Sequence, residues 1–135
     1  MRRTVEHRAS DPVIETSTST YHVRSDGIVV QTITHATKQT RDDALENIAA
    51  FIELSRARPT LFLLDMQTNF TVERGVRDIY AAPEHTSNIV AMAMVTRSAT
   101  TRVIGNFFMQ INRPPYPCKM FPRVLDAVAW LYRYR

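Results

Sequence analysis

The chain has little cysteine and little glycine, and each shortage excludes a class of protein. Cys118 is the single cysteine among 135 residues, so no disulfide can form within the chain. Disulfide-stapled secreted scaffolds are therefore excluded, and we expect a reducing, cytoplasmic location. Three glycines are too few for the glycine-rich loops that hold phosphates in P-loop and Rossmann proteins. The sequence predicts neither a nucleotide nor another cofactor.

Long apolar runs and polybasic runs are also absent. The longest apolar run covers residues 89–95 and is far shorter than a helix that crosses a bilayer. The charged N-terminus has no apolar segment behind it, so we expect neither a signal peptide nor a membrane span. The net charge is +4, but the basic residues are scattered along the chain, which argues against nucleic acid as a partner.

Motifs for catalysis and for metal binding are missing as well. The histidines, His7, His22, His35 and His85, do not pair at the spacing by which one helix face binds a metal. No Gly-x-Ser-x-Gly elbow is present, and Cys118 has no nearby histidine in the sequence to lower its pKa. We therefore predict no catalytic residue and no metal site. An enzyme of unspecified class, or a nucleic-acid binder that relies on the basic charge, stays open as an alternative.

The sequence does contain a regular alternation of strand and helix patterns. Strands are predicted at residues 14–24, 28–35, 61–64, 89–95 and 118–121, and helices at 41–56, 72–81, 99–111 and from Pro122 onward. The order ββαβαβαβα predicts an α/β fold with a single mixed, mostly parallel five-stranded sheet and four helices. Residues 1–12 are expected to be a flexible N-terminal arm, and residues 13–135 a single α/β domain.

Local signals indicate where the turn and the helix ends lie. Asp26-Gly27 separates the first two strands and suits a two-residue type I′ hairpin turn, in which both positions need φ > 0. Thr40 and Thr71 are the predicted N-caps of the first two helices, because a threonine hydroxyl accepts a free N–H of the first turn. Pro83 is predicted to end the second helix.

Apolar residues at helical spacing predict the inward faces of the helices. In helix 41–56 they are Leu45, Ile48, Ala49 and Ile52. In helix 99–111 they are Val103, Ile104, Phe107, Phe108 and Ile111, and in the last helix they are Val124, Leu125, Val128, Leu131 and Tyr132. Arg102 and Asn106 lie off the stripe of helix 99–111, so we expect them on its solvent side.

The C-terminal half also carries a recognisable pattern. Residues 98–108, followed by residues 112–117 and Phe121, resemble the signature of the uncharacterised branch of the bacterial STAS/SpoIIAA-like domain family. Asp26-Gly27 in a hairpin and Asp65 at the end of the central strand fit the same pattern. The resemblance covers about residues 17–134 and implies a SpoIIAA/STAS-like fold. The better-known STAS relatives are anti-sigma-factor antagonists, so it also implies a non-catalytic regulatory module that binds a protein partner.

Those relatives bind a kinase and are switched off by phosphorylation at the helix after the central strand, usually within Asp-Ser-x-Gly. The matching stretch here, residues 65–71, lacks Asp-Ser-x-Gly, and Thr68 and Thr71 are its only hydroxyls. Both are candidate phosphoacceptors, since a phosphate at a helix N-terminus meets free N–H groups. The alternative, which the sequence favours, is that Thr71 is only an N-cap.

Polar residues around the proline-rich connector 114–117 form a candidate binding cluster. Its members are Asp65, Arg102, Asn106, Asn112, Arg113 and Tyr116. Arg102 and Asn106 share a helix face, and with the two residues after the helix they would suit an anion. The favoured alternative is that Arg102 and Asn106 hydrogen-bond to loop carbonyls and hold the connector in place.

The favoured function is a regulatory, protein-binding module whose partner binds at the hairpin edge or at the second helix. A homodimer is a further option. The alternative function is a small-ligand or lipid-binding domain with an apolar pocket between helices and sheet. Methionine suits such a pocket because its side chain is flexible, and the candidates for the lining are Met66, Met92, Met94, Met109 and Met120.

Overall fold

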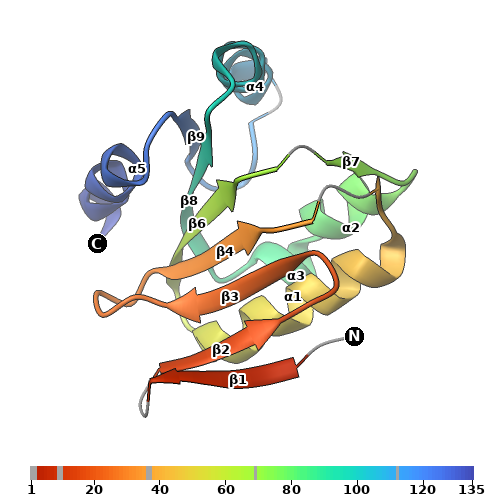
Figure 1. The fold of residues 1–135 in the computed structure, drawn as a ribbon. Helices are drawn as coiled ribbons and strands as arrows, with labels where there is room; N and C mark the ends of the chain where they lie inside the picture. The colour runs from red at the N-terminus through yellow and green to blue at the C-terminus, as the bar shows by residue number, and fades with distance from the viewer. Residues whose placement is uncertain (1–2, 9–10, 36–37, 69, 112) are drawn as a thin grey trace.

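A mixed β-sheet forms the centre of the fold (Figure 1). The computed structural model describes residues 3–8, 11–35, 38–68, 70–111 and 113–135. The strands of the sheet are β1 Arg3–Arg8, β2 Asp11–Glu15, β3 Ser19–Val23, β4 Val29–Ile33, β6 Thr60–Met66, β8 Ile89–Thr96 and β9 Cys118–Phe121. Two short strands, β5 Lys38–Gln39 and β7 Thr71–Val72, pair in parallel as a separate sheet.

The strands of the large sheet lie side by side in chain order, β1-β2-β3-β4-β6-β8-β9. Neighbours from β1 to β4 are antiparallel, and neighbours from β4 to β9 are parallel. Parallel neighbours need a long crossover connection, which is usually helical. The predicted α/β class with a mixed sheet is therefore confirmed.

Helices make the crossovers and complete the fold. In the described residues they are α1 Arg41–Ser55, α2 Val76–Ala81, α3 Pro83–Thr86, α4 Ala99–Ile111 and α5 Val124–Leu131, and the 3₁₀ turn η1 Tyr132–Tyr134 follows α5. Within this part of the chain, no helix combines the length and the apolar character that a membrane crossing requires.

The alternation of side chains along the strands divides the core into two clusters, one on each face of the sheet. On one face, Phe51 of α1 packs against Phe62 of β6 with ring centroids 4.7 Å apart. On the other face, Leu131 of α5 packs with Leu63 of β6. Successive strand residues point to opposite faces, so Leu64 returns to the cluster that contains Phe62. None of the described residues of α4 belongs to either cluster.

The N-terminal strands raise the count in the large sheet from the predicted five to seven. Residues 3–8 and 11–15 overlap the predicted arm and form β1 and β2 instead. The predicted strand 14–24 is broken because Thr16 and Ser19 close a tight turn, in which Thr16 N–H donates to Ser19 O at 2.9 Å. This turn allows β2 and β3 to pair as antiparallel neighbours.

The hairpin at Asp26-Gly27 forms, but the predicted two-residue turn is wrong. Gly27 has φ 88°, whereas Asp26 is not among the described residues with positive φ. The loop is longer: Gly27 N–H donates to Arg24 O, and Arg24 N–H donates to Ile28 O, both at 2.9 Å. The Asp26 carboxylate stabilises this loop by accepting from Arg24 Nε at 3.2 Å and from Ile28 N–H at 3.3 Å.

The second helix begins later than its sequence predicts. Thr71 and Val72 pair with β5 as a strand, so the prediction that Thr71 is an N-cap is wrong. Gly75, with φ 89°, precedes the first turn of α2 and provides no side-chain cap. The helix ends at Ala81, and Pro83 begins the short α3.

Helix α1 buries a different face from the one that its apolar spacing predicts. Of the predicted face, Ile48 is buried, whereas Leu45 is 48% exposed. Asn47 is 1% exposed, and its amide nitrogen donates to Thr18 Oγ1 at 3.0 Å and to Tyr80 Oη at 3.1 Å. This buried polar network, which apolar spacing does not reveal, sets the inward face together with the apolar side chains.

Helix α5 keeps part of its predicted inward face. Val128 and Leu131 are buried, whereas Leu125 is 81% exposed. Tyr132 is also exposed, and its hydroxyl donates to Asp26 Oδ2 at 2.5 Å. This bond links the last turn of the chain to the loop between β3 and β4.

Candidate functional site

Helix α4 lies along β9, the last strand of the large sheet. Met120 N–H of β9 donates to Asn106 Oδ1 of α4 at 3.0 Å. A side-chain amide therefore occupies a backbone donor at the sheet edge, which is one way in which proteins protect an edge strand. Gly105 allows the close approach, because a Cβ at this position would overlap the Met120 side chain.

The start of α4 is fixed to the end of β8. Arg102 Nη1 donates to Thr96 O at 2.7 Å, and Ser98 Oγ accepts from Thr101 N–H at 3.1 Å. Arg102 and Asn106 thus both turn toward the sheet, so the prediction that they lie on the solvent side of the helix is wrong. Each bonds to the backbone of a strand rather than to the connector 114–117.

The apolar stripe of α4 is exposed. Val103 is 70% exposed, Ile104 50%, Phe107 59% and Ile111 60%. These four side chains are called the α4 face from here on. Figure 1 shows α4 beyond β8 and β9, apart from the helices that cover the two faces of the sheet. For these four residues the prediction that the stripe is core is wrong, because the opposite side of α4 makes the contact with β9; the side chain of Phe108 lies outside the described part of the structure.

The α4 face carries no charge. Arg102 is the single charged residue of α4, and its guanidinium bonds to Thr96 O on the inner side of the helix. An exposed apolar surface without interspersed charge is typical of a binding surface rather than of an ordinary solvated helix.

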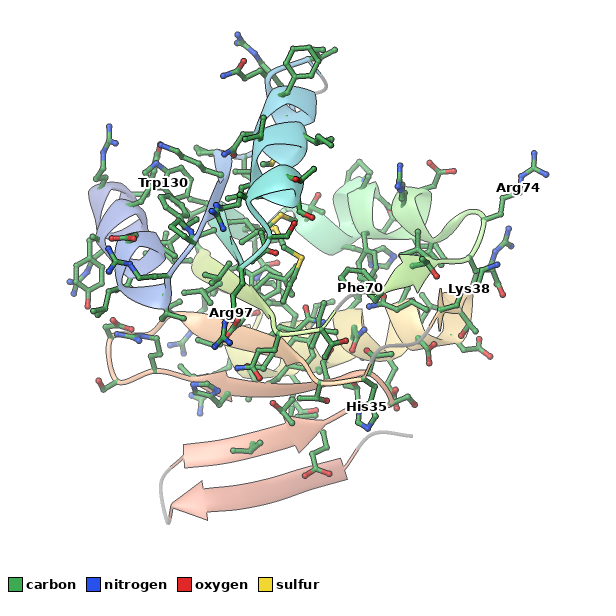
Figure 2. All side chains as sticks on the ribbon, turned by 45° about the horizontal axis from the view of Figure 1, so that its top comes forward. His35, Lys38, Phe70, Arg74, Arg97 and Trp130 are labelled. Atoms are coloured by element: carbon green, nitrogen blue, oxygen red, sulfur yellow. The ribbon has the colours of Figure 1, made fainter. Side chains whose placement is uncertain are left out.

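A groove of about 740 Å³ lies beside β9, between α4 and α5. Its lining comprises Asn106, Met109 and Gln110 of α4, the connector residues 113–117, Cys118 and Lys119 of β9, and Trp130 and Tyr134. We call it the β9 groove. Figure 2 shows Trp130 on the side of α5 that is turned toward α4.

The β9 groove combines positive charge with aromatic rings. Arg113 and Lys119 line it, and the described lining residues include no aspartate or glutamate. The ring centroid of Trp130 lies 5.0 Å from that of Tyr134 and 5.6 Å from that of Phe121. Lys119 Nζ lies 5.4 Å from the Phe121 centroid. Trp130 meets Tyr134 edge to face and Phe121 at a tilt of 50°, so the aromatic wall is held in place with a cation beside it.

Tyr116 and Cys118 line the β9 groove as neutral groups. Burial, followed by repulsion from Cys118, raises the pKa of the Tyr116 hydroxyl to about 12. Burial likewise raises the pKa of the Cys118 thiol to about 12. The thiolate is the nucleophilic form of cysteine, so this environment does not activate Cys118 for catalysis.

A second hollow, of about 290 Å³, opens at the carboxyl ends of β6 and β8, where Asp65 lies with Arg97 and Arg123. The predicted binding cluster is therefore divided between sites. Asn106, Arg113 and Tyr116 line the β9 groove, Asp65 lines the second hollow, and Arg102 bonds at the start of α4. Asn112 lies outside the described residues.

Neither candidate phosphoacceptor lies at the N-terminus of a helix. Thr71 is exposed in β7, and Thr68 lies in the segment between β6 and β7. Helix α2 begins only at Val76. The argument that a phosphate would meet the free N–H groups of a first helical turn therefore does not apply to these positions.

Four of the five methionines proposed to line one apolar pocket lie on the α1 side of the sheet. Met66, Met92 and Met94 pack with the core on that side, and Met120 of β9 is the neighbour of Met94 across the sheet. Met109 lines the β9 groove and Met66 also lines the second hollow, so neither of these two hollows is lined by more than one of the five methionines.

The sequence patterns did not predict the aromatic residues and the lysine that line the β9 groove. Trp130 and Tyr134 are four positions apart and so share a side of a helical segment, a signal that the apolar stripe of the last helix obscured. Lys119 is a lone lysine on a short strand and carries no pattern at all. In the part of the chain that the structure describes, no group of three or more histidine, cysteine, aspartate or glutamate side chains could hold a metal ion.

Comparison with known proteins identifies the family. A model described as a domain of unknown function, DUF7793, matches residues 21–135. The chain belongs to the DUF7793 family. The match includes the whole of α4 and α5, so this DUF7793 domain contains both the α4 face and the β9 groove.

A solved structure of another protein has a fold similar to that of this DUF7793 domain. An uncharacterized protein of the DUF3478 family with a SpoIIAA-like fold, from Shewanella loihica PV-4, aligns over 96% of this chain and 93% of its own length. The TM-score is 0.59 and the sequence identity 15%. The predicted SpoIIAA-like fold is therefore confirmed, and at this identity the likeness concerns the fold alone. No curated protein matches the chain.

Proposed function

We propose that this DUF7793 domain is a non-catalytic regulatory module that binds protein through the α4 face. The observation that carries the proposal is the exposure of four apolar side chains along one uncharged side of α4. Cys118 does not provide a nucleophile in this proposal, because burial raises the pKa of its thiol to about 12.

The size of the α4 face suits a protein interface. From their exposed fractions, the four side chains leave roughly 400 Å² of apolar surface in water, a size at which patches mark interaction sites. Two copies paired through this patch would cover roughly 800 Å² of apolar surface, whereas a stable interface buries about 1,200–2,000 Å² in total. The four side chains therefore suit the apolar core of an interface, with the residues around them as its rim.

A second copy of the chain is the occupant that we propose for the α4 face, because an uncharged apolar face is complementary to itself. The domain has a net charge of +4, so two copies repel each other wherever basic surfaces meet. The α4 face is uncharged, and a two-fold axis would place it against itself without opposing like charges. Figure 1 shows α4 at the margin of the fold, so its outer side is open to a second copy.

Sedimentation velocity over a range of protein concentrations tests this proposal. We expect a reversible dimer for the natural chain and a monomer for the double variant Val103→Ser/Ile111→Ser, which places two hydroxyls at the ends of the α4 face. Leu125→Ser is the matched control, because Leu125 is an apolar side chain on α5 that is 81% exposed and lies outside the α4 face.

Two results would contradict the proposal. A monomer at every concentration would exclude the second copy as the occupant. Dissociation of the dimer by Leu125→Ser to the same extent as by the double variant would place the interface elsewhere. Both variants change exposed side chains, so their far-UV circular dichroism should match that of the natural chain and confirm that the folded state is being compared. The double variant should lose only the concentration-dependent stability that dimerisation gives the natural chain.

A further inference from the structure

We infer that the β9 groove is a binding site for a small aromatic carboxylate. The groove meets α4 at Asn106, Met109 and Gln110, and none of the four side chains of the α4 face lines it. Its volume of about 740 Å³ is large enough to hold a small organic ligand with one side open to solvent.

The walls of the groove favour a flat ring. Trp130 and Tyr134 stand edge to face, with ring centroids 5.0 Å apart. Pro114, Pro115 and Tyr116 line the groove from the connector. Aromatic and proline rings present rigid apolar surfaces that lose little conformational freedom when a ligand packs on them. A flat apolar ligand therefore gains more here than a flexible polar one.

The charges of the groove favour an anion. Arg113 and Lys119 are its two cations, and no carboxylate occurs among the described lining residues. A guanidinium can donate two parallel N–H bonds to a carboxylate. Asn106 uses its amide oxygen for Met120 N–H, so the amide nitrogen is its remaining donor. The donors in the groove thus complement an acceptor such as a carboxylate and oppose a ligand with a positive charge.

The order of affinities follows from these contacts. A carboxylate on a ring forms charge-assisted hydrogen bonds, the corresponding amide forms only neutral ones, and the corresponding amine is repelled. Charge-assisted bonds are roughly twice as strong as neutral ones, so the carboxylate should bind about tenfold or more tightly than its amide. The amine should bind more weakly than either.

The single tryptophan of the chain, Trp130, lies in the wall of the groove and reports binding directly. The fluorescence of the natural chain is titrated with 3-phenylpropanoate, 3-phenylpropanamide and 3-phenylpropylamine, which share a ring and a chain but differ in charge. We expect a saturable change in Trp130 emission, with 3-phenylpropanoate the tightest ligand and the amine the weakest.

The variant Arg113→Gln/Lys119→Gln separates charge recognition from the shape of the groove. It should reduce the affinity for 3-phenylpropanoate about tenfold or more, to that of the amide, because charge-assisted bonds become neutral ones. The affinity for 3-phenylpropanamide should stay unchanged, which shows that the groove is intact. Arg123→Gln removes an exposed arginine outside the groove and should leave all three titrations as they are.

Several results would overturn the inference. One is the absence of a saturable change in Trp130 emission with 3-phenylpropanoate. Another is equal affinity of the natural chain for 3-phenylpropanoate and 3-phenylpropylamine. A third is an equal loss of affinity for 3-phenylpropanoate in Arg123→Gln and in Arg113→Gln/Lys119→Gln. The measurement is independent of the α4 face, since Val103→Ser/Ile111→Ser should leave the titrations unchanged. Failure of the proposed dimer and failure of the ligand site are therefore distinguishable.

Discussion

Asn106 joins α4 to the edge of the sheet, and its replacement by alanine should detach the two. The variant Asn106→Ala removes the acceptor of Met120 N–H, a bond of 3.0 Å in a partly buried setting. Loss of such a partner costs about 1–2 kcal/mol, whereas alanine regains about 0.6 kcal/mol of helix propensity over asparagine. The net loss of stability should therefore be about 1 kcal/mol.

The variant Asn106→Asp provides the matched control. A carboxylate oxygen can still accept Met120 N–H, and aspartate and asparagine have similar helix propensities. We therefore expect Asn106→Asp to unfold close to the natural chain, whereas Asn106→Ala should melt about 4 °C lower, as expected for about 1 kcal/mol in a domain of this size. Thermal unfolding followed by circular dichroism measures the difference.

Amide hydrogen exchange adds a readout at the bond itself. The exchange of Met120 N–H should accelerate in Asn106→Ala and stay slow in Asn106→Asp, while amides in the centre of β6 change little. Equal exchange of Met120 in the natural chain and in Asn106→Ala, together with an unchanged melting temperature, would refute the argument that this side chain holds the edge.

Two further predictions concern titratable groups. Burial alone would raise the pKa of Asp26, but hydrogen bonds from Arg24, Tyr132 and the Ile28 N–H outweigh it and lower the pKa below 3.8. A lowered pKa stabilises the fold above the unfolded-state pKa, and this stability is lost as pH falls through the folded-state value. Asp26→Asn should therefore flatten the acid-side fall in unfolding free energy, measured by urea titration from about pH 5 to about pH 2, and identical slopes would contradict this. Cys118, whose pKa burial raises to about 12, should react with iodoacetamide far more slowly in the folded chain than in urea, and equal rates by mass spectrometry would show that the thiol is accessible.

The buried strands and the order of elements could be predicted because each carries its own local evidence. The apolar runs at residues 61–64 and 89–95 became β6 and β8, which lie side by side in parallel. The strands β5 and β7 could not be predicted, because two residues are too few for any period. The turn that separates β2 from β3 could not be predicted either, because Thr16 and Ser19 are compatible with a strand as well as with a turn.

Helix α4 shows the limit of apolar spacing. The stripe from Val103 to Ile111 correctly predicted a helix, but spacing cannot tell a face that packs on the chain's own core from one that faces outward. The contrary signal was Gly105 beside Asn106 in the middle of the helix, where a missing side chain marks a close approach. The β9 groove could not be predicted from local patterns. Its lining comes from α4, the connector 114–117 and α5, which are brought together only by the topology of the fold.

The strands of the large sheet lie side by side in the order in which the ribosome synthesises them. Each strand of the large sheet joins the one synthesised before it, from β1 through to β9. Each new strand can therefore pair with the strand of this sheet that was synthesised before it. Few contacts within the sheet join strands that are far apart in the sequence. Helix α4 precedes β9 in the chain, so Asn106, the acceptor for Met120 N–H at the edge of the sheet, has already been synthesised when β9 pairs with β8. The last strand of the sheet can therefore be covered as soon as it forms.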